Sequence, residues 1–349
     1  MGKIEFRSSI ERFSIMNPFN NFAVEEHQVE VRKDPLLGDT SIYNPFLKDK
    51  ARAFFGVNDQ ELIRKIAEET ARGCIFCPEA VETKTAKYPP DLIPEGRIRR
   101  GEAVLFANLF SVGKYHPVIA MSKAHFLKLS EFTPEIIGNG FRAAQGFLRA
   151  VCEKDVSAQY TTVNANYLLP AGASLIHPHM QMLITPEPYS YQSRLLEAVD
   201  RYHEEKGSSY FADLIKEEKR RGSRYIAQTG NWHWLTAFSP MGTNEVLAVH
   251  EEKADFASLS NEEITALASG ISRVLSFYEG LDQMSFNYTL FSTRESAGHN
   301  GSRCLFKIIT RQNLYPNYRN DDYFLQKLLQ SELIFTLPEE LAEGVRGKF

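Results

Sequence analysis

Apolar residues follow strand and helix periods along most of the chain after about residue 100. Short apolar runs predict strands, which cover residues 103–110, 117–121, 160–167 and 175–183. Thr133-Pro-Glu135 is a helix start, and the apolar residues after it recur at helical spacing as far as Val151. A charged helical region at 193–221, broken by Gly207, then predicts a connector.

The same order of elements recurs after this connector. Strands are predicted at 234–238, 245–249 and 303–309, and a Ser260-Asn-Glu-Glu263 capping box starts a long helix among them. The two series lie about 130 residues apart, too far for a solenoid repeat, so we interpret them as a duplication. We take Asn166-Tyr167 and Asn287-Tyr288 as counterparts in the two copies.

The sequence therefore predicts an α+β fold of two tandem halves, each an antiparallel sheet with packed helices. The first half would span residues 1–192 and the second residues 193–349. Residues 1 to about 70 carry no comparable pattern, so we expect them to be irregular apart from a short amphipathic helix near 59–72.

Composition narrows the class of protein. Of the 349 residues, 43% are hydrophobic and 24% are charged, with a formal net charge of -4. This globular balance lacks a basic excess, so we expect a small-molecule partner and no nucleic acid. No apolar run reaches the length of a membrane span, and the first residues lack the apolar core of a signal peptide. We therefore expect no membrane partner and a cytoplasmic protein.

The segment Ala171-Gly-Ala-Ser-Leu-Ile-His-Pro-His-Met-Gln181 places polar groups in an apolar, strand-like context. In an extended chain His177, His179 and Gln181 share one face. Burying two imidazoles and an amide costs free energy unless each finds a partner, so the three residues together indicate a site. The alternative is a pair of hydrogen-bonded core histidines.

A metal site is the second candidate. Cys74-Ile-Phe-Cys77 with two separated histidines, His125 and His177, forms a Cys₂His₂ set of the kind that suits tetrahedral zinc. Four protein ligands would make this metal structural. A thioredoxin-like redox pair is disfavoured because the cysteines follow a predicted helix instead of opening one. A zinc deaminase is disfavoured because its cysteine pair follows its His-x-Glu motif, whereas here the two histidines follow the cysteines and lack that glutamate.

With His177 tied to a metal, His179 remains available for chemistry. A neutral imidazole held in one tautomer is a competent nucleophile towards phosphorus. Gln181 and the backbone N–H groups from Gly172 to Ser174 could hold the phosphoryl oxygens. The pattern thus favours phosphoryl or nucleotidyl transfer over hydrolysis by metal-bound water, which needs an open coordination position.

These residues resemble a known family. Asn166-Tyr-Leu-Leu-Pro-Ala-Gly-Ala-Ser-Leu-Ile-His-Pro-His-Met-Gln181 resembles the signature of the histidine triad superfamily branch that contains galactose-1-phosphate uridylyltransferase, ADP-glucose phosphorylase and diadenosine tetraphosphate phosphorylases. Arg32-x-Asp-Pro-x-x-Gly38, the cysteine pair, Phe106-Ala-Asn-Leu-Phe110 and Met121-Ser-x-x-His125 extend the resemblance through most of the chain.

The resemblance implies two histidine-triad-like halves, of which the first carries the catalytic histidine and a zinc site and the second is degenerate. It implies transfer of a nucleoside monophosphate between a nucleotide sugar and a sugar phosphate or phosphate, through a covalent nucleotidyl-His179. The enzyme would be most like hexose-1-phosphate uridylyltransferase, and a homodimer is possible. The implied zinc ligands are Cys74, Cys77, His125 and His177, and the implied substrate contacts are Asn108, Asn166, Gly172, Ser174, Gln181, Lys50 and, by a looser alignment, Glu332.

The sequence also departs from the family pattern. Phe306 and Ile308 stand where some uridylyltransferases have a second metal site, so we expect no second metal. Lys50 replaces an arginine, and Leu109 follows Asn108 where the uridylyltransferases usually have an aspartate. The alternatives are therefore an enzyme like ADP-glucose phosphorylase or a dinucleoside polyphosphate phosphorylase, or a non-catalytic relative that binds zinc or nucleotide.

Overall fold

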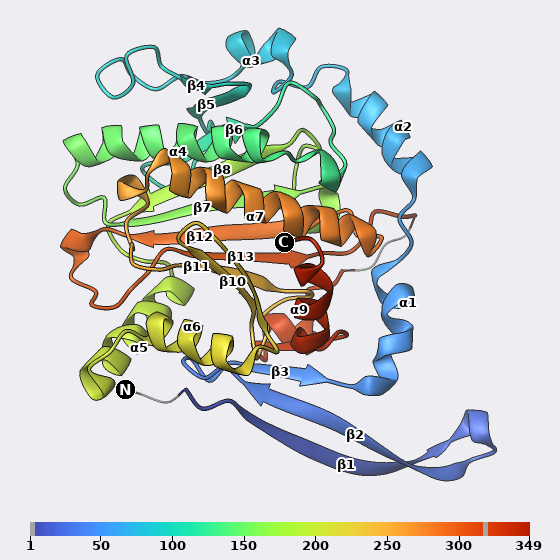
Figure 1. Cartoon of the computed structure of the whole chain (residues 1–349). Coiled ribbons are helices and arrows are strands. Elements are labelled where there is room, and N and C mark those ends of the chain that lie inside the picture. Colours follow the sequence, from blue (N-terminus) through green and yellow to red (C-terminus); the bar gives the residue numbers. More distant parts are fainter. Residues whose placement is uncertain (1–3, 317–319) are drawn as a thin grey trace.

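The computed structural model describes residues 4–316 and 320–349, whose strands form a large sheet of ten strands and a small sheet of four (Figure 1). Across the large sheet the order is β4 (Ile98–Arg100), β5 (Ala103–Ala107), β6 (Pro117–Ala120), β8 (His179–Thr185), β7 (Tyr160–Tyr167), β12 (Phe286–Thr293), β13 (Leu305–Thr310), β11 (Val246–His250), β10 (Trp232–Thr236) and β9 (Tyr225–Thr229). The small sheet has the order β1 (Arg7–Asn17), β2 (Ala23–Lys33), β3 (Thr40–Tyr43) and β14 (Ser331–Ile334).

Two long helices cover one face of the large sheet (Figure 1). They are α4 (Pro134–Lys154) and α7 (Asn261–Gly280), and both begin at the predicted signals. Thr133 caps α4 by accepting the backbone N–H of Ile136, and Ser260 and Glu263 form the expected capping box of α7. The remaining helices are α1 (Ala51–Phe55), α2 (Gln60–Ala71), α3 (Pro78–Lys84), α5 (Ser190–Lys206), α6 (Tyr210–Arg221), α8 (Phe324–Lys327) and α9 (Pro338–Arg346).

Among the described residues, buried apolar clusters cover the opposite face of the large sheet towards its two ends. At one end α5 and α6 pack on residues of β10, β11 and β13, including Leu235, Leu247 and Leu305. At the other end the cysteine segment packs on β5 and β6 through Phe76 and Phe106. The middle strands β8, β7 and β12 therefore present their outward side chains between these two covered regions.

The two predicted halves each contribute five neighbouring antiparallel strands, β4 to β8 and β9 to β13, but these do not form separate sheets. Strands β7 and β12 pair with each other along their whole length, so the strands of both predicted halves join one antiparallel sheet. Asn166 and Asn287 do not occupy equivalent positions in these strands, because Asn166 is near the end of β7 and Asn287 is near the start of β12, where the ladder places them opposite each other. The division into halves at residue 192 stays a prediction.

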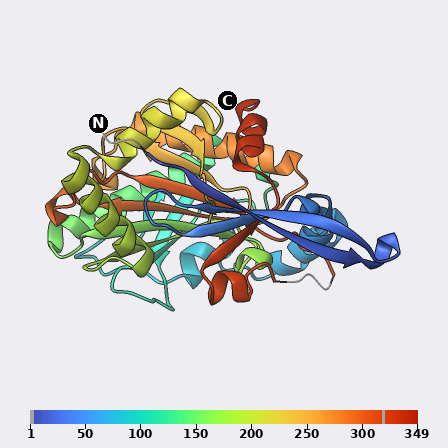
Figure 2. The same ribbon diagram turned by 90° about the horizontal axis from the view of Figure 1, so that it is seen from below.

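The expectation that residues 1 to about 70 are irregular was wrong. Strands β1 and β2 form a long antiparallel hairpin that projects from the body of the protein, and β3 joins it to β14 (Figure 2). Nearly every residue of β1 is exposed, and Phe19 at the hairpin tip is 98% exposed. A strand with no buried face lacks the alternation of apolar and polar residues that marks strands in a sequence. The short helix predicted near 59–72 is α2.

Among the described residues, no helix combines the length and the apolar character needed to cross a membrane.

Candidate active site and metal centre

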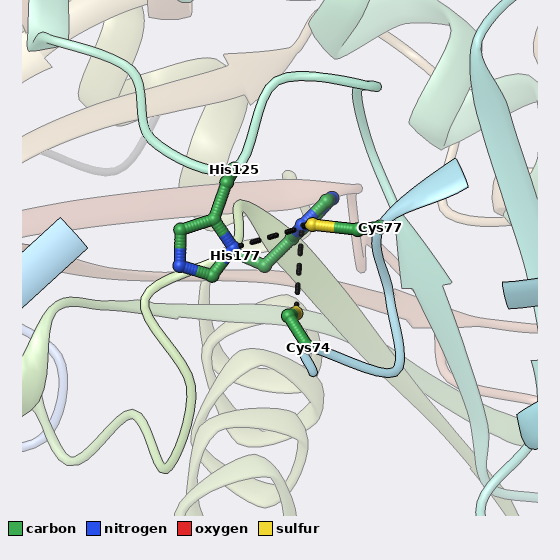
Figure 3. A group of neighbouring side chains, drawn as sticks. All are labelled: Cys74, Cys77, His125 and His177. Carbon is green, nitrogen blue, oxygen red and sulfur yellow. Dashed lines mark hydrogen bonds between the residues drawn. The ribbon is translucent and has the colours of Figure 1, made fainter. Parts of the chain in front are cut away.

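Four predicted ligands meet at one end of the large sheet. One candidate ligand atom from each of Cys74, Cys77, His125 and His177 can be chosen so that all lie within 4.8 Å of one another (Figure 3). The cysteines lie between α2 and α3, His125 follows β6, and His177 lies two residues before the start of β8. Strand β8 begins only at His179, so His177 is outside the strand and does not share its regular alternation. The cluster could hold a metal ion.

In both histidines, a ring nitrogen that can bind a metal points towards the thiols. His177 Nε2 lies 2.9 Å from the Ser122 carbonyl oxygen, which can only accept, so this nitrogen carries the proton. The Nδ1 lone pair then faces the Cys77 Sγ at 3.6 Å. His125 follows the same rule, since its Nε2 lies 2.9 Å from the Thr70 hydroxyl, whose proton goes to the Ile66 carbonyl. Such outer hydrogen bonds fix the tautomer of metal-binding histidines.

Burial keeps these groups neutral at neutral pH. It lowers the pKa of His177 to about 4 and also lowers the pKa of His125. Burial, together with the neighbouring Cys74 thiol, raises the pKa of Cys77 to about 11. Neutral imidazoles are the form that binds a cation, and a bound cation would reverse the shift at the thiols.

His179, the predicted nucleophile, is held in one tautomer at the start of β8. Its Nδ1 lies 2.7 Å from the His177 carbonyl oxygen and must therefore donate, which leaves the lone pair on Nε2. The ring is only 6% exposed, and burial lowers its pKa, so it is neutral at neutral pH. Phe76, between the two cysteines, packs against it with ring centroids 5.4 Å apart. The metal cluster and His179 are therefore connected by the short backbone segment from His177 to His179 and by the packing of Phe76.

Polar side chains continue from His179 across the middle strands. Gln181 follows on the same face of β8 and lies opposite Asn164 of β7. Asn166, also on β7, accepts a hydrogen bond from Asn287 of β12 at 2.7 Å. This uncovered polar face can donate hydrogen bonds to a charged substrate, which an apolar sheet face cannot do.

No family model matches the sequence. An uncharacterized protein from Archaeoglobus fulgidus is 31% identical over 98% of both chains. Galactose-1-phosphate uridylyltransferase from Saccharomyces cerevisiae is 24% identical over 178 residues, which are 50% of this chain and 49% of the yeast protein. A solved structure of Arabidopsis thaliana ADP-glucose phosphorylase with bound ADP-glucose has the same fold, with a TM-score of 0.69 and 18% identity over 91% of this chain and 98% of that one.

The chain belongs to the galactose-1-phosphate uridylyltransferase and ADP-glucose phosphorylase branch of the histidine triad superfamily. The predicted membership is thus confirmed. In this family member the fold brings His179, Gln181 and Asn166 to neighbouring strands of one sheet, beside the cluster of predicted metal ligands. Their individual roles stay predictions.

Three predicted substrate contacts lie around this face. Gly172 follows the short 3-10 turn Leu169–Ala171 with a φ of 85°, and nothing lies within 4 Å of where its Cβ would stand. Ser174, two residues later, is exposed, as a donor to a substrate must be. Asn108 follows β5, and its Nδ2 lies 3.2 Å from Nε2 of His116.

Two further predicted contacts lie elsewhere in this family member. Lys50 is exposed directly before α1, and α2 separates it from the cysteines (Figure 1). Glu332 lies on β14 and lines a cavity of about 160 Å³ together with Ile309 of β13 and Arg311, which directly follows β13. Ile309 is opposite Asn287, which is opposite Asn166, so the cavity lies about three strand spacings, roughly 14 Å, from His179.

Residues that the sequence did not single out complete the site. Phe76 packs on His179, Thr70 orients His125, and His116 contacts both Asn108 and Gln181. None belongs to a spaced pair of ligand residues. The one available signal was the position of Phe76 inside the cysteine motif.

Proposed function

We propose that this protein is a zinc-containing nucleotidyltransferase that moves a nucleoside monophosphate between a nucleotide sugar and a phosphate acceptor through a covalent nucleotidyl-His179. The observation that supports it is the 2.7 Å hydrogen bond from His179 Nδ1 to the His177 carbonyl. It leaves Nε2 as the basic nitrogen of a neutral, buried ring. This is the tautomer and the protonation state that attack on phosphorus requires.

The reaction would proceed in two displacements. His179 Nε2 attacks the α-phosphorus of the nucleotide sugar, a nitrogen–phosphorus bond forms, and the sugar phosphate leaves with the electrons of the broken phosphorus–oxygen bond. An oxygen of the acceptor phosphate then attacks the same phosphorus, and Nε2 leaves with its electron pair. The Nδ1 hydrogen bond to the carbonyl stabilises the positive charge that the ring carries while it is nucleotidylated.

Charge on the transferred phosphoryl group needs hydrogen-bond donors. Gln181 lies on the same strand face as His179, and Asn166 lies on the adjacent strand with its Oδ1 already occupied by Asn287. The amide NH₂ of Asn166 therefore remains available to donate. Of the backbone N–H groups from Gly172 to Ser174, those of Gly172 and Ala173 already donate to the carbonyls of Leu169 and Leu168. The N–H and hydroxyl of exposed Ser174 are therefore the further candidates. Such preorganised donors are worth most where water is excluded.

The residues of the metal cluster fit zinc. Two thiols and two imidazoles, each imidazole with its outer nitrogen already donating, give the soft, four-membered donor set that structural zinc sites use. When bound, zinc would cross-link the cysteine segment to the residue that precedes β8 and so hold the backbone that carries His179. No open position remains for a zinc-bound nucleophile.

A phosphorylase that acts on ADP-glucose or on a dinucleoside polyphosphate is the second candidate. Leu109, which is 77% exposed, follows Asn108 in place of the aspartate expected in a uridylyltransferase. An apolar side chain cannot form the hydrogen bonds that distinguish uracil. Leu109 therefore favours a base other than uracil, or a site that accepts more than one base. The acceptor, the proposed homodimer and the cytoplasmic location are separate predictions.

Covalent trapping tests the proposal. The purified protein is incubated with UDP-glucose, UDP-galactose, ADP-glucose or diadenosine tetraphosphate carrying ³²P at the α-phosphate, and acid-labile label on the protein is measured. We expect label from at least one donor, its loss in His179→Ala, and its retention in His299→Ala, a control at a partly buried histidine outside the proposed site. Nucleotide binding without label from any donor would instead support a non-catalytic relative.

A further inference from the structure

His116 connects two parts of the proposed site. It lies just before β6, is only 5% exposed, and has a hydrogen-bond partner on each ring nitrogen. Its Nδ1 lies 3.1 Å from the backbone nitrogen of Val112, and its Nε2 lies 2.8 Å from Oε1 of Gln181. A backbone N–H can only donate, so Nδ1 carries the lone pair. The Asn108 NH₂ lies 3.4 Å from Nδ1 and 3.2 Å from Nε2, and as a donor it can bond only to the unprotonated Nδ1. In the neutral ring Nε2 therefore carries the proton and donates it to Gln181.

This bond decides how the Gln181 amide is turned. The two ends of an amide are hard to distinguish by shape, and its hydrogen-bond partners determine which end is the oxygen. Because Nε2–H of His116 requires an acceptor, the oxygen of Gln181 faces His116. The NH₂ group is then free to donate to a ligand on the face that also carries His179.

The same residue also holds the loop from Asn108 to Val112 in place, through its ring at Val112 and through its backbone at Asn108. The Asn108 N–H donates to the His116 carbonyl at 3.1 Å, and the Asn108 side-chain oxygen accepts from the Phe110 N–H at 2.9 Å. Phe110 and Val112 remain mostly exposed. One buried imidazole thus links the backbone of an exposed apolar loop to an amide beside His179.

We propose that His116 is a positioning residue that aims the Gln181 NH₂ group at the transferred phosphoryl group and ties this amide to the Asn108–Val112 loop. The inference rests on the proposed function, because it assigns Gln181 to the phosphoryl group. A ligand that contacts the loop would thereby also fix the donor that serves the reacting phosphorus. Binding and chemistry would be connected through one side chain.

A pair of substitutions separates the two bonds of the ring. In His116→Gln the longer side chain places an NH₂ near the former Nε2 and keeps the bond to Gln181. In His116→Asn the shorter side chain reaches only the former Nδ1 position, so it keeps an acceptor for Val112 and loses Gln181. We expect His116→Asn to lower the single-turnover rate of His179 labelling about 10–100-fold, by analogy with the loss of a residue that orients a metal ligand. KM should change less than threefold.

His116→Gln should stay within about threefold of the wild-type rate. In a Gln181→Ala background, His116→Asn should have less than a twofold effect, because its target is gone. Equal impairment of both His116 variants, or a full effect of His116→Asn in the Gln181→Ala background, would overturn the inference and indicate a general structural role.

A second measurement does not depend on activity. Urea unfolding of wild type, His116→Asn, Gln181→Ala and the double variant gives the coupling between the two side chains. We expect a coupling of at least fivefold in the unfolding equilibrium constant, and additive effects would overturn the inference. If the wild type forms no label with any donor but the coupling is present, the proposed function fails while the bond between these residues stands.

Discussion

Removal of one thiol from the metal cluster is the sharpest test of the proposed zinc site. In Cys77→Ser the Sγ that lies 3.5 Å from His125 Nδ1 and 3.6 Å from His177 Nδ1 is replaced by a hydroxyl, a poor ligand for zinc. Cys152→Ser is the matched control, because Cys152 is partly buried on α4 and belongs to no metal-binding group within the described residues.

The size of the effect follows from linkage. A metal that binds only the folded state, present at 100 to 1,000 times its dissociation constant, stabilises that state by about 2.7 to 4.1 kcal/mol. An unfolding entropy of about 2.1 cal/mol/K per residue gives roughly 0.7 kcal/mol/K for a chain of this length. Chelation should therefore lower Tm of the wild type by about 4–6 °C.

Metal content and thermal unfolding measured together check this reasoning. We expect one zinc per chain in the wild type and in Cys152→Ser, with the full chelator response in both. Cys77→Ser should hold well under one zinc and unfold at the temperature of the chelated wild type. A wild-type protein that holds no zinc after growth with zinc, or whose Tm is the same with and without chelator, would refute the assignment of these four residues.

Two further predictions concern stability. Gly270→Ala should destabilise the protein by about 1–3 kcal/mol in urea unfolding, because a Cβ would stand 2.0 Å from the ring of fully buried Trp234 and overpacking outweighs the gain in helix propensity. Gly280→Ala, with nothing within 4 Å, should be neutral or slightly stabilising, and equal stability of the two variants would contradict this. Burial raises the pKa of Glu332 to about 7 from 4.5, so the folded state binds the proton more tightly. Its contribution to stability should be fully present below pH 4.5 and fall by up to about 3 kcal/mol as the pH rises through 7. Glu332→Gln should remove this fall, and parallel pH profiles of the two proteins would contradict the assignment.

Regular, half-buried elements could be predicted from the sequence because burial of one face gives the apolar residues a regular spacing. Helix α4 has its apolar face on the sheet and its cap at Thr133, and both signals are local. Strand β7 occupies the predicted residues because its apolar face lies on the core. The metal cluster could be predicted because the cysteine spacing and the two histidines carry a known donor chemistry.

Long-range pairing could not be predicted. The repeat of Asn166 and Asn287 suggested equivalent positions, whereas they lie at opposite ends of neighbouring strands and their side chains bond to each other. His116 is a single histidine without a spaced partner, and its function depends on Gln181, 65 residues further along the chain. A pattern confined to one segment contains no information on which strand will lie beside it.

The hairpin of β1 and β2 has a consequence for the behaviour of the protein in solution. Within the described part of the chain β1 is the outermost strand of the small sheet, so its outer backbone groups offer a template to any extended peptide. Exposed apolar residues such as Ile10 and Phe13 would favour such addition. Glu11 and Arg12 interrupt them with opposite charges, and these two side chains act as gatekeepers that oppose uncontrolled self-association of the free edge.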